Sequence, residues 1–475
     1  MQGADAELCG GGDLIRLFKH YVAYPVIVLC VVDFAVLLLV AEAGWVLRLR
    51  QLGLDAGTVW DRLPQLLTFA LSMQAAMIGV GVYSADAMQA FRFAAARLLV
   101  AISLGVILIS VLRFAFPLLS LWRSNSLYSM VLAVVLLMVV RVLLGGFISG
   151  DLFKRRILLL GAGRRARRVL DLEKRPGAGF VITGCVDMKD APALIETAIS
   201  RTDVISLADL VGRTQADEVV LALDERRNTV PIDALLRLKT TGVHVTDIST
   251  FLERETGRID LDTLHPSWLI FSDGFSSGRQ LQMLLKRGFD IVASALLLIL
   301  AAPLILATAL LVKLDSRGPA FYRQTRVGLN GRRFIILKLR SMRSDAEAGG
   351  GAIWARKGDV RITRIGRIIR LVRVDELPQL WTVLTGDMSF VGPRPERPEF
   401  VAELERQIPF YAERHMVKPG ITGWAQINYP YGASLEDARH KLEYDLYYSK
   451  NSSPFLDILI ILQTMRVLLW AEGAR

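Results

Sequence analysis

The stretch KRGFDIVASALLLILAAPLILATALLVKLDSRGP, residues 286–319, decides how the second half of this chain meets a membrane. It contains an apolar run over 291–312, and a helix needs only about 20 apolar residues to cross the hydrocarbon of a bilayer. Pro303 lies near the middle of the run, where a proline removes one helical hydrogen bond. The run therefore predicts either a kinked spanning helix or a helix-break-helix hairpin that enters and leaves the same leaflet.

Four other apolar runs fill the first third of the chain, and each has about the length of a transmembrane helix. They predict a four-span helical bundle over residues 1–150, in a chain that is 52% hydrophobic. No short apolar core with a small-residue cleavage site opens the chain, so we expect the first run to remain as an anchor. The runs cover about 24–46, 66–82, 98–116 and 127–148.

The basic residues Lys154, Arg155 and Arg156 directly follow the fourth run and mark the cytoplasmic side. If the run at 291–312 also crossed, everything after it would lie outside the cell, with the basic segment 323–343 against the positive-inside rule. The ends of that run carry similar charge, as expected if both face one side. Because prolines are tolerated in spanning helices, the residues alone leave the hairpin and the spanning helix about equally open.

Three charged residues, Asp33, Glu42 and Arg141, interrupt the apolar runs. Charged side chains within a membrane usually face the interior of a bundle and find partners there. These three are too few to form a transport pathway. We therefore expect structural pairs or side chains at the membrane interface.

Composition argues against several other classes of site. The three cysteines, Cys9, Cys30 and Cys185, form no CxxC pair, and the five histidines are scattered, so neither a disulfide framework nor a structural zinc site is predicted. The formal net charge is +11, but the arginines cluster beside apolar runs and no nucleic-acid-binding motif is present. We expect membrane lipid and phosphorylated substrates as partners, and no nucleic acid.

Residues 151–255 are predicted to form a Rossmann-like α/β domain, followed by a linker over 256–280. The turn GAGRRA (161–166) follows the first strand, and Asp187 lies where such folds keep a ribose-binding carboxylate. Either a nucleotide binds at this turn, or the domain only packs or regulates. The second interpretation is favoured, because a lone GxGxxA is a weak motif and arginines crowd the turn. The expected strands include ILLL (157–160), FVITGCVD (180–187) and DEVVLALD (217–224).

The stretch VDELPQLWTVLTGDMSFVGPRPE, residues 374–396, places Asp375 and Glu376 side by side before Pro378, a residue suited to the first turn of a helix. Both carboxylates would then lie at the positive end of this helix, where phosphates and divalent metals gather. One carboxylate can hold Mg²⁺ while its neighbour attacks phosphorus. The residues expected to pack inward are Leu377, Leu380, Trp381 and Leu384.

Cationic residues near this pair predict a diphosphate site. Pro393 and Pro395 restrict the backbone around Arg394, whose planar guanidinium suits bidentate phosphate contact. Lys338 and Arg340 alternate onto one face if KLRSM is a strand. For an isolated Asp-Glu pair, a solvated helix cap with a surface salt bridge is the commoner interpretation.

Five segments, in order along the chain, favour the diphosphate site over a solvated helix cap. They are KRGFDIVAS, the proline-broken run, GPAFYRQTRVGLNGRRFIILKLRSM, DVRITRIGRIIRLVRVDELPQLWTVLTGDMSFVGPRPE and KPGITGWAQINYPYG. Together they closely resemble the bacterial sugar transferase family, the monotopic phosphoglycosyl transferases, over residues 281–475. With four spans and an α/β domain in front, the chain is similar to the long, polytopic form, the polyprenyl glycosylphosphotransferases that start exopolysaccharide or O-antigen synthesis. HPSWLIFSDGF and YPYGASLEDARHKLEYDLYY resemble the exosortase-associated subgroup.

The resemblance implies a fold and a reaction. The fold is a four-span membrane bundle, a Rossmann-like domain and an α/β phosphoglycosyl transferase domain, whose re-entrant hairpin covers about 284–314 and breaks at Ala302 and Pro303. In the reaction, a UDP-sugar, commonly a UDP-hexose, and undecaprenyl phosphate give undecaprenyl-diphosphate-sugar and UMP. The catalytic domain would lie on the cytoplasmic face of the bacterial inner membrane. A homodimer through the bundle or the α/β domain is a further expectation.

The resemblance also implies residue roles. Asp375 would be the nucleophile that carries the phosphosugar in a ping-pong scheme, and Glu376 would help to bind Mg²⁺. The chain departs from the family at Ala302, where serine is usual. A hydroxyl that caps the backbone groups freed by Pro303 must therefore come from elsewhere, such as Ser294. The chain departs again at Leu339, which replaces the usual phenylalanine and leaves the charges of Lys338 and Arg340 in place. Lys338, Arg340 and Arg394 would hold phosphate oxygens, and Lys418, Gly423 and Gln426 would lie at the nucleotide or sugar end.

Two other functions are open. Membrane-bound NAD-dependent nucleotide-sugar dehydratases and epimerases also join four spans to an α/β domain, but they oxidise through a Tyr-x-x-x-Lys pair, which none of the eleven tyrosines here forms. A non-catalytic membrane scaffold is opposed by the intact Asp375-Glu376 pair and Arg394. At the end of the chain, residues 455–470 fit a helix in the membrane interface, with Trp470 at headgroup depth, and a buried core helix equally well.

Overall fold

The structure, a computed structural model, divides into two compact units, Met1–Gly257 and Arg258–Arg475. Most of the predicted linker, residues 265–279, lies outside the described residues. Described are residues 14–17, 20–55, 57–83, 91–116, 123–148, 154–175, 178–189, 191–225, 230–264, 280–343, 361–430, 432 and 434–470.

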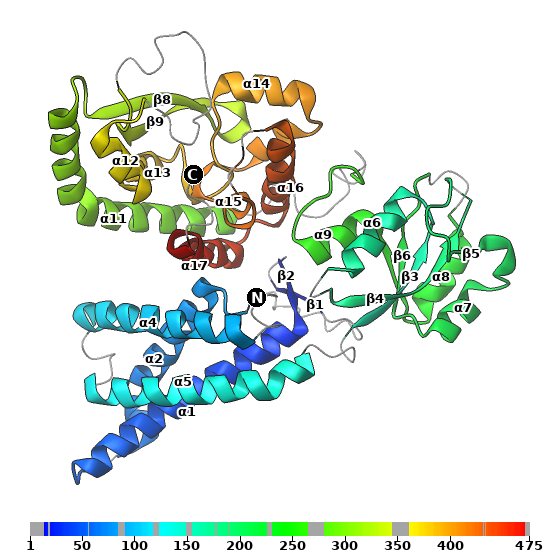
Figure 1. The fold of residues 1–475 in the computed structure, drawn as a ribbon, viewed down its shortest axis with the longest axis horizontal. Coiled ribbons are helices and arrows are strands. Elements are labelled where there is room, and N and C mark those ends of the chain that lie inside the picture. Colours follow the sequence, from blue (N-terminus) through cyan, green and yellow to red (C-terminus); the bar gives the residue numbers. More distant parts are fainter. Residues whose placement is uncertain are drawn as a thin grey trace. The chain divides into compact units, whose positions relative to one another are not determined.

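Four long helices form a bundle in the first unit (Figure 1). α1 packs along α5 and α2, and α2 packs along α4, around a core that includes Phe69, Met73 and Leu98. Each helix covers most of one predicted apolar run. The helices are α1 (Tyr24–Gln51), α2 (Val59–Val80), α4 (Phe91–Ala115) and α5 (Arg123–Ile148), preceded by a hairpin of β1 (Leu14–Leu17) and β2 (His20–Ala23).

The charged residues inside the bundle are paired, as predicted. The guanidinium of Arg141 donates to both carboxylate oxygens of Asp33, at 3.1 and 2.7 Å, and the hydroxyl of Tyr83 donates to Asp33 Oδ2 at 2.8 Å. Glu42 accepts a hydrogen bond from Nε of Arg62 at 2.7 Å. Because a membrane interior offers no water, such pairing is what makes these charges tolerable there.

The α/β part of the first unit is a parallel sheet with the strand order β5-β4-β3-β6-β7. In chain order this is 3-2-1-4-5, the order of a doubly wound sheet. Ile157 and Leu159 of β3 share one core with α6 and α9, and Leu158 and Leu160 share the other with α7 and α8. The strands are β3 (Arg155–Leu160), β4 (Phe180–Asp187), β5 (Ile199–Ser200), β6 (Glu218–Leu221) and β7 (His244–Asp247). The helices are α6 (Arg164–Glu173), η3 (Arg201–Asp203), α7 (Leu207–Thr214), α8 (Ile232–Thr240) and α9 (Ile248–Thr256).

The glycine turn before α6 is occupied by a carboxylate of the chain itself. Asp224 Oδ2 accepts the backbone N–H of Arg164 at 2.8 Å, and its Oδ1 accepts the N–H of Arg165 at 3.0 Å. A Cβ atom on Gly163 would lie 2.3 Å from Asp224 Oδ2, so glycine is required there by this contact. The position at which a nucleotide phosphate would meet the helix N-terminus is thus filled by Asp224. This favours the interpretation of the α/β part as a module without a nucleotide at the turn.

The second unit begins with α11 (Gln280–Asp315), which bends sharply into two arms (Figure 1). Pro303 lies within this helix. The first arm packs on α13, and the second packs on β9 and α12 through Val312. The hydroxyl of Ser294 bonds to the carbonyl of Asp290 one turn earlier, so the suggestion that it caps the groups freed by Pro303 is wrong.

Short strands and helices complete the second unit. β8 (Phe321–Val327) and β9 (Arg333–Leu339) form an antiparallel hairpin around η4 (Leu329–Gly331), and β10 (Ser389–Val391) pairs in parallel with β11 (Gly420–Thr422). The helices are α12 (Arg364–Leu371), η5 (Val374–Glu376), α13 (Gln379–Thr385), α14 (Pro398–Gln407), η6 (Tyr411–Met416), α15 (Trp424–Asn428), α16 (Leu435–Asn451) and α17 (Pro454–Trp470).

The C-terminal helix α17 presents one face to the core. Leu456 and Ile460 are fully buried there, whereas Ile458 is 57% exposed. The side chain of Trp470 lies outside the described residues. The core-helix interpretation therefore holds for one face of α17, and its placement in a membrane interface stays a prediction.

Polar side chains of the KRGFD segment tie the first arm of α11 to the rest of the unit. The guanidinium of Arg287 donates to the carbonyls of Val383 and Leu384, both at 2.8 Å, at the end of α13. Asp290 Oδ1 accepts the hydroxyl of Ser389 and the N–H of Phe390, both at 3.1 Å. The ends of α13 and β10 are thereby fixed to α11.

Candidate active site

The adjacent carboxylates lie in η5, one short turn before α13. Arg373, just before this turn, has a left-handed backbone with φ of 57°, and this reversal separates η5 from α12. Asp375 is buried, with 8% of its surface exposed. Leu380 packs inward as predicted, but Trp381 is 54% exposed, so its predicted burial is wrong. The η5 turn shifts the helical phase, and Val383 takes the buried position instead.

Two cations from distant parts of the chain meet on Glu376. Lys338 Nζ lies 3.0 Å from Glu376 Oε1, and Arg394 Nη2 lies 2.9 Å from the same oxygen. Arg373 Nη1 lies 4.0 Å from the other oxygen, Oε2. The structure therefore brings together four of the predicted residues, Asp375, Glu376, Lys338 and Arg394.

The electrostatics of the two carboxylates differ. Burial alone would raise the pKa of Glu376, but the charges of Lys338, Arg394 and Arg373 outweigh it and hold this pKa well below its usual range. Burial raises the pKa of Asp375, and the negative charge of Glu376 raises it further. Glu376 is therefore a fixed anion, while Asp375 is the more basic carboxylate. Environments that push two neighbouring pKa values apart are typical of sites with divided chemical roles.

The hydrogen-bonding capacity of Asp375 is not fully used within the described residues. Its Oδ1 is buried and has no hydrogen-bond partner among the described residues. A buried polar atom without a partner is costly, so it usually marks a place where a ligand, an ion or a water binds. The carboxylate of Asp375 is therefore a group that can interact with a ligand beside Glu376.

The same carboxylates fit a magnesium ion that is shared with a substrate. Glu376 Oε2 lies 4.0 Å from Arg373 Nη1, so this oxygen and the carboxylate of Asp375 could serve as metal ligands. Within the described part of the chain, no group of three or more potential metal-ligating side chains occurs. Mg²⁺ commonly binds through one or two carboxylates, with phosphates and waters completing the shell. A metal here would therefore depend on a bound diphosphate.

The loop that carries Arg394 is held by backbone contacts with KPGITG. Gly392 N–H donates to the carbonyl of Thr422, and Gly420 N–H donates to the carbonyl of Pro393, both at 2.9 Å. A Cβ atom on Gly392 would lie 2.2 Å from the carbonyl oxygen of Lys418. Only glycine allows the two segments to approach this closely. The KPGITG segment thus positions the loop of Arg394.

A buried ion pair supports the same loop from behind. Arg414 donates to Asp445 Oδ2 from Nε at 3.1 Å and from Nη2 at 2.7 Å, and Nη2 also donates to the carbonyl of Arg394 at 3.0 Å. Arg326 Nη1 donates to the carbonyl of Pro395 at 2.9 Å. Arg414, Asp445 and Arg326 are not among the site residues predicted from the sequence. For Arg326 a signal existed, because the hairpin register places it on the same face as Lys338.

The other predicted site residues lie elsewhere. Arg340 is buried and donates to the carbonyls of Ser316 and Arg317 at the end of α11, both at 2.7 Å. Its placement beside Lys338 is therefore wrong, because the strand ends at Leu339 and Arg340 serves as a helix cap.

The residues predicted at the nucleotide or sugar end belong to the KPGITGWAQ segment, whose backbone contacts the loop of Arg394. Lys418 is near Arg287 and Asp290, Gln426 Nε2 donates to the carbonyl of Ile421 at 3.1 Å, and a Cβ on Gly423 would lie 2.2 Å from the carbonyl oxygen of Gly392. Burial lowers the pKa of Lys418, and the charge of Arg287 lowers it further. These contacts are structural, and a nucleotide or sugar contact of Lys418, Gly423 and Gln426 stays a prediction.

Comparison with known proteins adds an independent observation. Residues 281–471 match the bacterial sugar transferase family. A UDP-N-acetylgalactosamine-undecaprenyl-phosphate N-acetylgalactosaminephosphotransferase of Aeromonas hydrophila is 46% identical over 241 residues, 51% of this chain and 56% of that protein. The chain thus spans little more than half the length of this relative.

Two further relatives are named UDP-glucose:undecaprenyl-phosphate glucose-1-phosphate transferase. The protein of Klebsiella pneumoniae is 33% identical over 342 residues, 69% of this chain and 70% of that protein. The protein of Caulobacter vibrioides is 46% identical over 191 residues, 40% of this chain and 71% of that protein. The Klebsiella match extends well beyond the residues of the family match.

Proposed function

Since this chain belongs to the bacterial sugar transferase family, we propose that it transfers a sugar-1-phosphate, from a UDP-hexose in the simplest case, to undecaprenyl phosphate. The products are undecaprenyl-diphosphate-sugar and UMP, and the step begins exopolysaccharide or O-antigen synthesis. The names of the three relatives support this reaction. The observation that carries it is the Asp375-Glu376 pair, with Lys338 and Arg394 both bound to Glu376.

In the first step, the ionised carboxylate of Asp375 attacks the phosphorus that bears the sugar. A new bond forms between this phosphorus and a carboxylate oxygen, and the bond to UMP breaks. The raised pKa of Asp375 supports this role, because a more basic carboxylate is a stronger nucleophile. Its Oδ1 has no hydrogen-bond partner among the described residues.

In the second step, a phosphate oxygen of undecaprenyl phosphate attacks the same phosphorus, and the carboxylate of Asp375 leaves. Lys338 and Arg394 hold phosphate oxygens and offset the charge that develops in both transition states. Glu376 keeps these two cations in place, because its low pKa keeps it charged. When bound, Mg²⁺ would neutralise charge on the donor diphosphate, with Glu376 Oε2 as a ligand.

We further propose that α11 is a re-entrant membrane hairpin, on the cytoplasmic face of the bacterial inner membrane. Both of its ends contact the same globular unit, the first arm through Arg287 and the second through Arg340. A straight spanning helix of 36 residues would separate its ends by about 54 Å, so the bend supports the hairpin. The four-helix bundle would then be the part that crosses the membrane.

The test uses the full chain, purified in nonionic detergent with Mg²⁺ and undecaprenyl phosphate. UMP release is followed with a panel of UDP-sugars for the parent and for Asp375→Asn, and an exposed variant, Asp387→Asn, serves as the control. We expect release with one donor, lost in Asp375→Asn and kept in the control. Full activity of Asp375→Asn would contradict its role as the nucleophile.

A further inference from the structure

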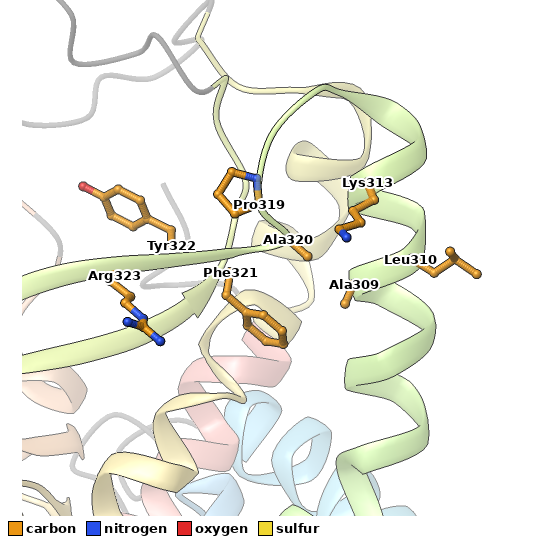
Figure 2. A pocket seen from close by; sticks show the side chains of 8 residues that line it. All are labelled: Ala309, Leu310, Lys313, Pro319, Ala320, Phe321, Tyr322 and Arg323. Atoms are coloured by element: carbon orange, nitrogen blue, oxygen red, sulfur yellow. The ribbon is translucent and has the colours of Figure 1, made fainter.

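A pocket outside the carboxylate cluster lies between the second arm of α11 and the start of β8 (Figure 2). It is an open pocket of about 800 Å³, and most of the side chains around it are apolar. Neither the sequence motifs nor the proposed transfer step accounts for it. It is lined by Ala309, Leu310 and Lys313 of α11 and by Pro319, Ala320, Phe321, Tyr322 and Arg323.

Two cations border this apolar pocket. Lys313 extends from α11 toward Ala320, and Arg323 lies on the same side of β8 as Phe321 (Figure 2). Among the described residues, neither cation forms an ion pair or a side-chain hydrogen bond. Two free cations beside apolar side chains suit a ligand with a doubly charged phosphate on a hydrocarbon chain.

One side of the pocket borders a surface suited to lipid. Leu306, Leu310 and Leu314 recur at helical spacing on α11 and are 68, 60 and 75% exposed. Leu310 belongs both to this surface and to the pocket lining. A hydrocarbon chain could therefore pass from a bilayer into the pocket without exposing its apolar surface to water.

One lining residue of the pocket lies on the face of the β8-β9 hairpin that carries Lys338. Tyr322 lies directly opposite Lys338 in the β8-β9 register, so both side chains share one face of the hairpin. Lys338 in turn bonds to Glu376 at 3.0 Å. Phe321 and Arg323 lie on the opposite face of the strand, so residues from both faces of β8 line the pocket.

We propose that this pocket binds a lipid phosphate monoester, with the phosphate between Lys313 and Arg323 and the first hydrocarbon units against Leu310 and Phe321. The inference rests on the proposed function, in which this ligand is the acceptor, undecaprenyl phosphate. Tyr322 of the pocket is the cross-strand neighbour of Lys338, so the pocket holds the acceptor beside the strand pair that carries a cation of the carboxylate cluster. The same chemistry occurs in anionic phospholipids, so the experiment separates the two sources.

The kinetic test compares the parent with the double variant Lys313→Gln, Arg323→Gln. A matched control, Arg332→Gln, Arg333→Gln, removes the same charge at the other end of the hairpin. UMP released without acceptor reports the first step, and we expect it to be the same in all three proteins. The KM for undecaprenyl phosphate should rise about tenfold or more in the pocket variant alone, because two charge-assisted contacts are lost. An unchanged KM would overturn the proposal.

A binding arm identifies the lipid without relying on turnover. Native mass spectrometry measures retention of undecaprenyl phosphate and of phosphatidylglycerol by the same three proteins. Loss of undecaprenyl phosphate alone from the pocket variant supports an acceptor site, and equal loss of both lipids would overturn the acceptor role in favour of a general lipid site. If the parent releases no UMP with any donor, the proposed function fails, but this arm still decides whether the pocket binds lipid phosphate.

Discussion

Lys338 Nζ and Glu376 Oε1 lie 3.0 Å apart, and this contact joins a strand of the β8-β9 hairpin to the turn that carries Asp375. The pair places the ammonium of Lys338 and the carboxylate of Glu376 beside Asp375, the proposed nucleophile. Because Lys338 and Glu376 are 38 residues apart in sequence, folding is needed to bring them together.

We expect Lys338→Met to lower kcat/KM for the donor by about 10²–10³-fold, because a preorganised cation at the transferred phosphate is lost. The first step, measured as UMP release without acceptor, should show the same loss. Arg333→Gln, at the far end of the same hairpin, is the matched control and should stay within twofold of the parent. An equal loss in both variants would mean that Lys338 has no special role.

Arg414 is expected to act through Arg394 as a positioning residue. Arg414→Lys keeps the charge beside Asp445 but loses the bond to the carbonyl of Arg394, so kcat should fall about tenfold with little change in the donor KM. In an Arg394→Ala background, Arg414→Lys should cause no further loss of activity. An additive loss in the double variant would contradict this coupling. Arg406→Lys, an exposed arginine in α14, is the control.

The pH profile of the first step should report the ionisation of Asp375. Its pKa is raised by burial and by Glu376, and only the ionised form attacks, so the rate should fall as the pH drops through this raised pKa. The charge of Arg370 lowers the pKa of Asp375, so Arg370→Gln should raise this pKa and move the acid limb to higher pH.

The control for the pH profile is Arg367→Gln, an exposed arginine of the same helix that is not among the groups that shift the pKa of Asp375. Its acid limb should coincide with that of the parent. A shift of the same size and sign in both variants would assign the effect to the net charge of α12.

The Gly161 turn is expected to bind no dinucleotide in the parent protein. Asp224→Ala removes the carboxylate that accepts the N–H groups of Arg164 and Arg165, at a cost of about 1 kcal/mol in local stability. Hydrogen exchange should then become faster at these two amides, with UMP release unchanged. Binding of NAD⁺ by the parent, lost in Asp187→Ala, would instead support the dinucleotide interpretation.

The membrane helices and the central charges of the site could be predicted from the sequence. Apolar runs identify α1 to α5 because membrane length and hydropathy are local properties. The pairing of Asp33 with Arg141 follows from the cost of an isolated charge in hydrocarbon. Lys338, Glu376 and Arg394 were predicted to form one site, and in the structure both cations contact Glu376.

Other features could not be read from local pattern. Arg340 follows its strand by one residue, and its partners are carbonyls at the end of α11, which only the tertiary fold brings near. Trp381 was misassigned because the η5 turn changes the helical phase before α13 begins. Arg414 reaches the carbonyl of Arg394 across a segment with no regular spacing, so periodicity gives no signal.

The hydrogen bonds of Arg287 couple the first arm of α11 directly to the end of α13. Arg287 of α11 holds the C-terminal end of α13, while Asp375 and Glu376 lie just before the first residue of α13. If α11 is the re-entrant hairpin proposed above, a bilayer whose thickness does not match it would tilt its arms at modest energetic cost. Such a tilt would reach α13, which follows Asp375, through the two hydrogen bonds of Arg287, so the thickness of the surrounding membrane would then influence the geometry of the proposed nucleophile.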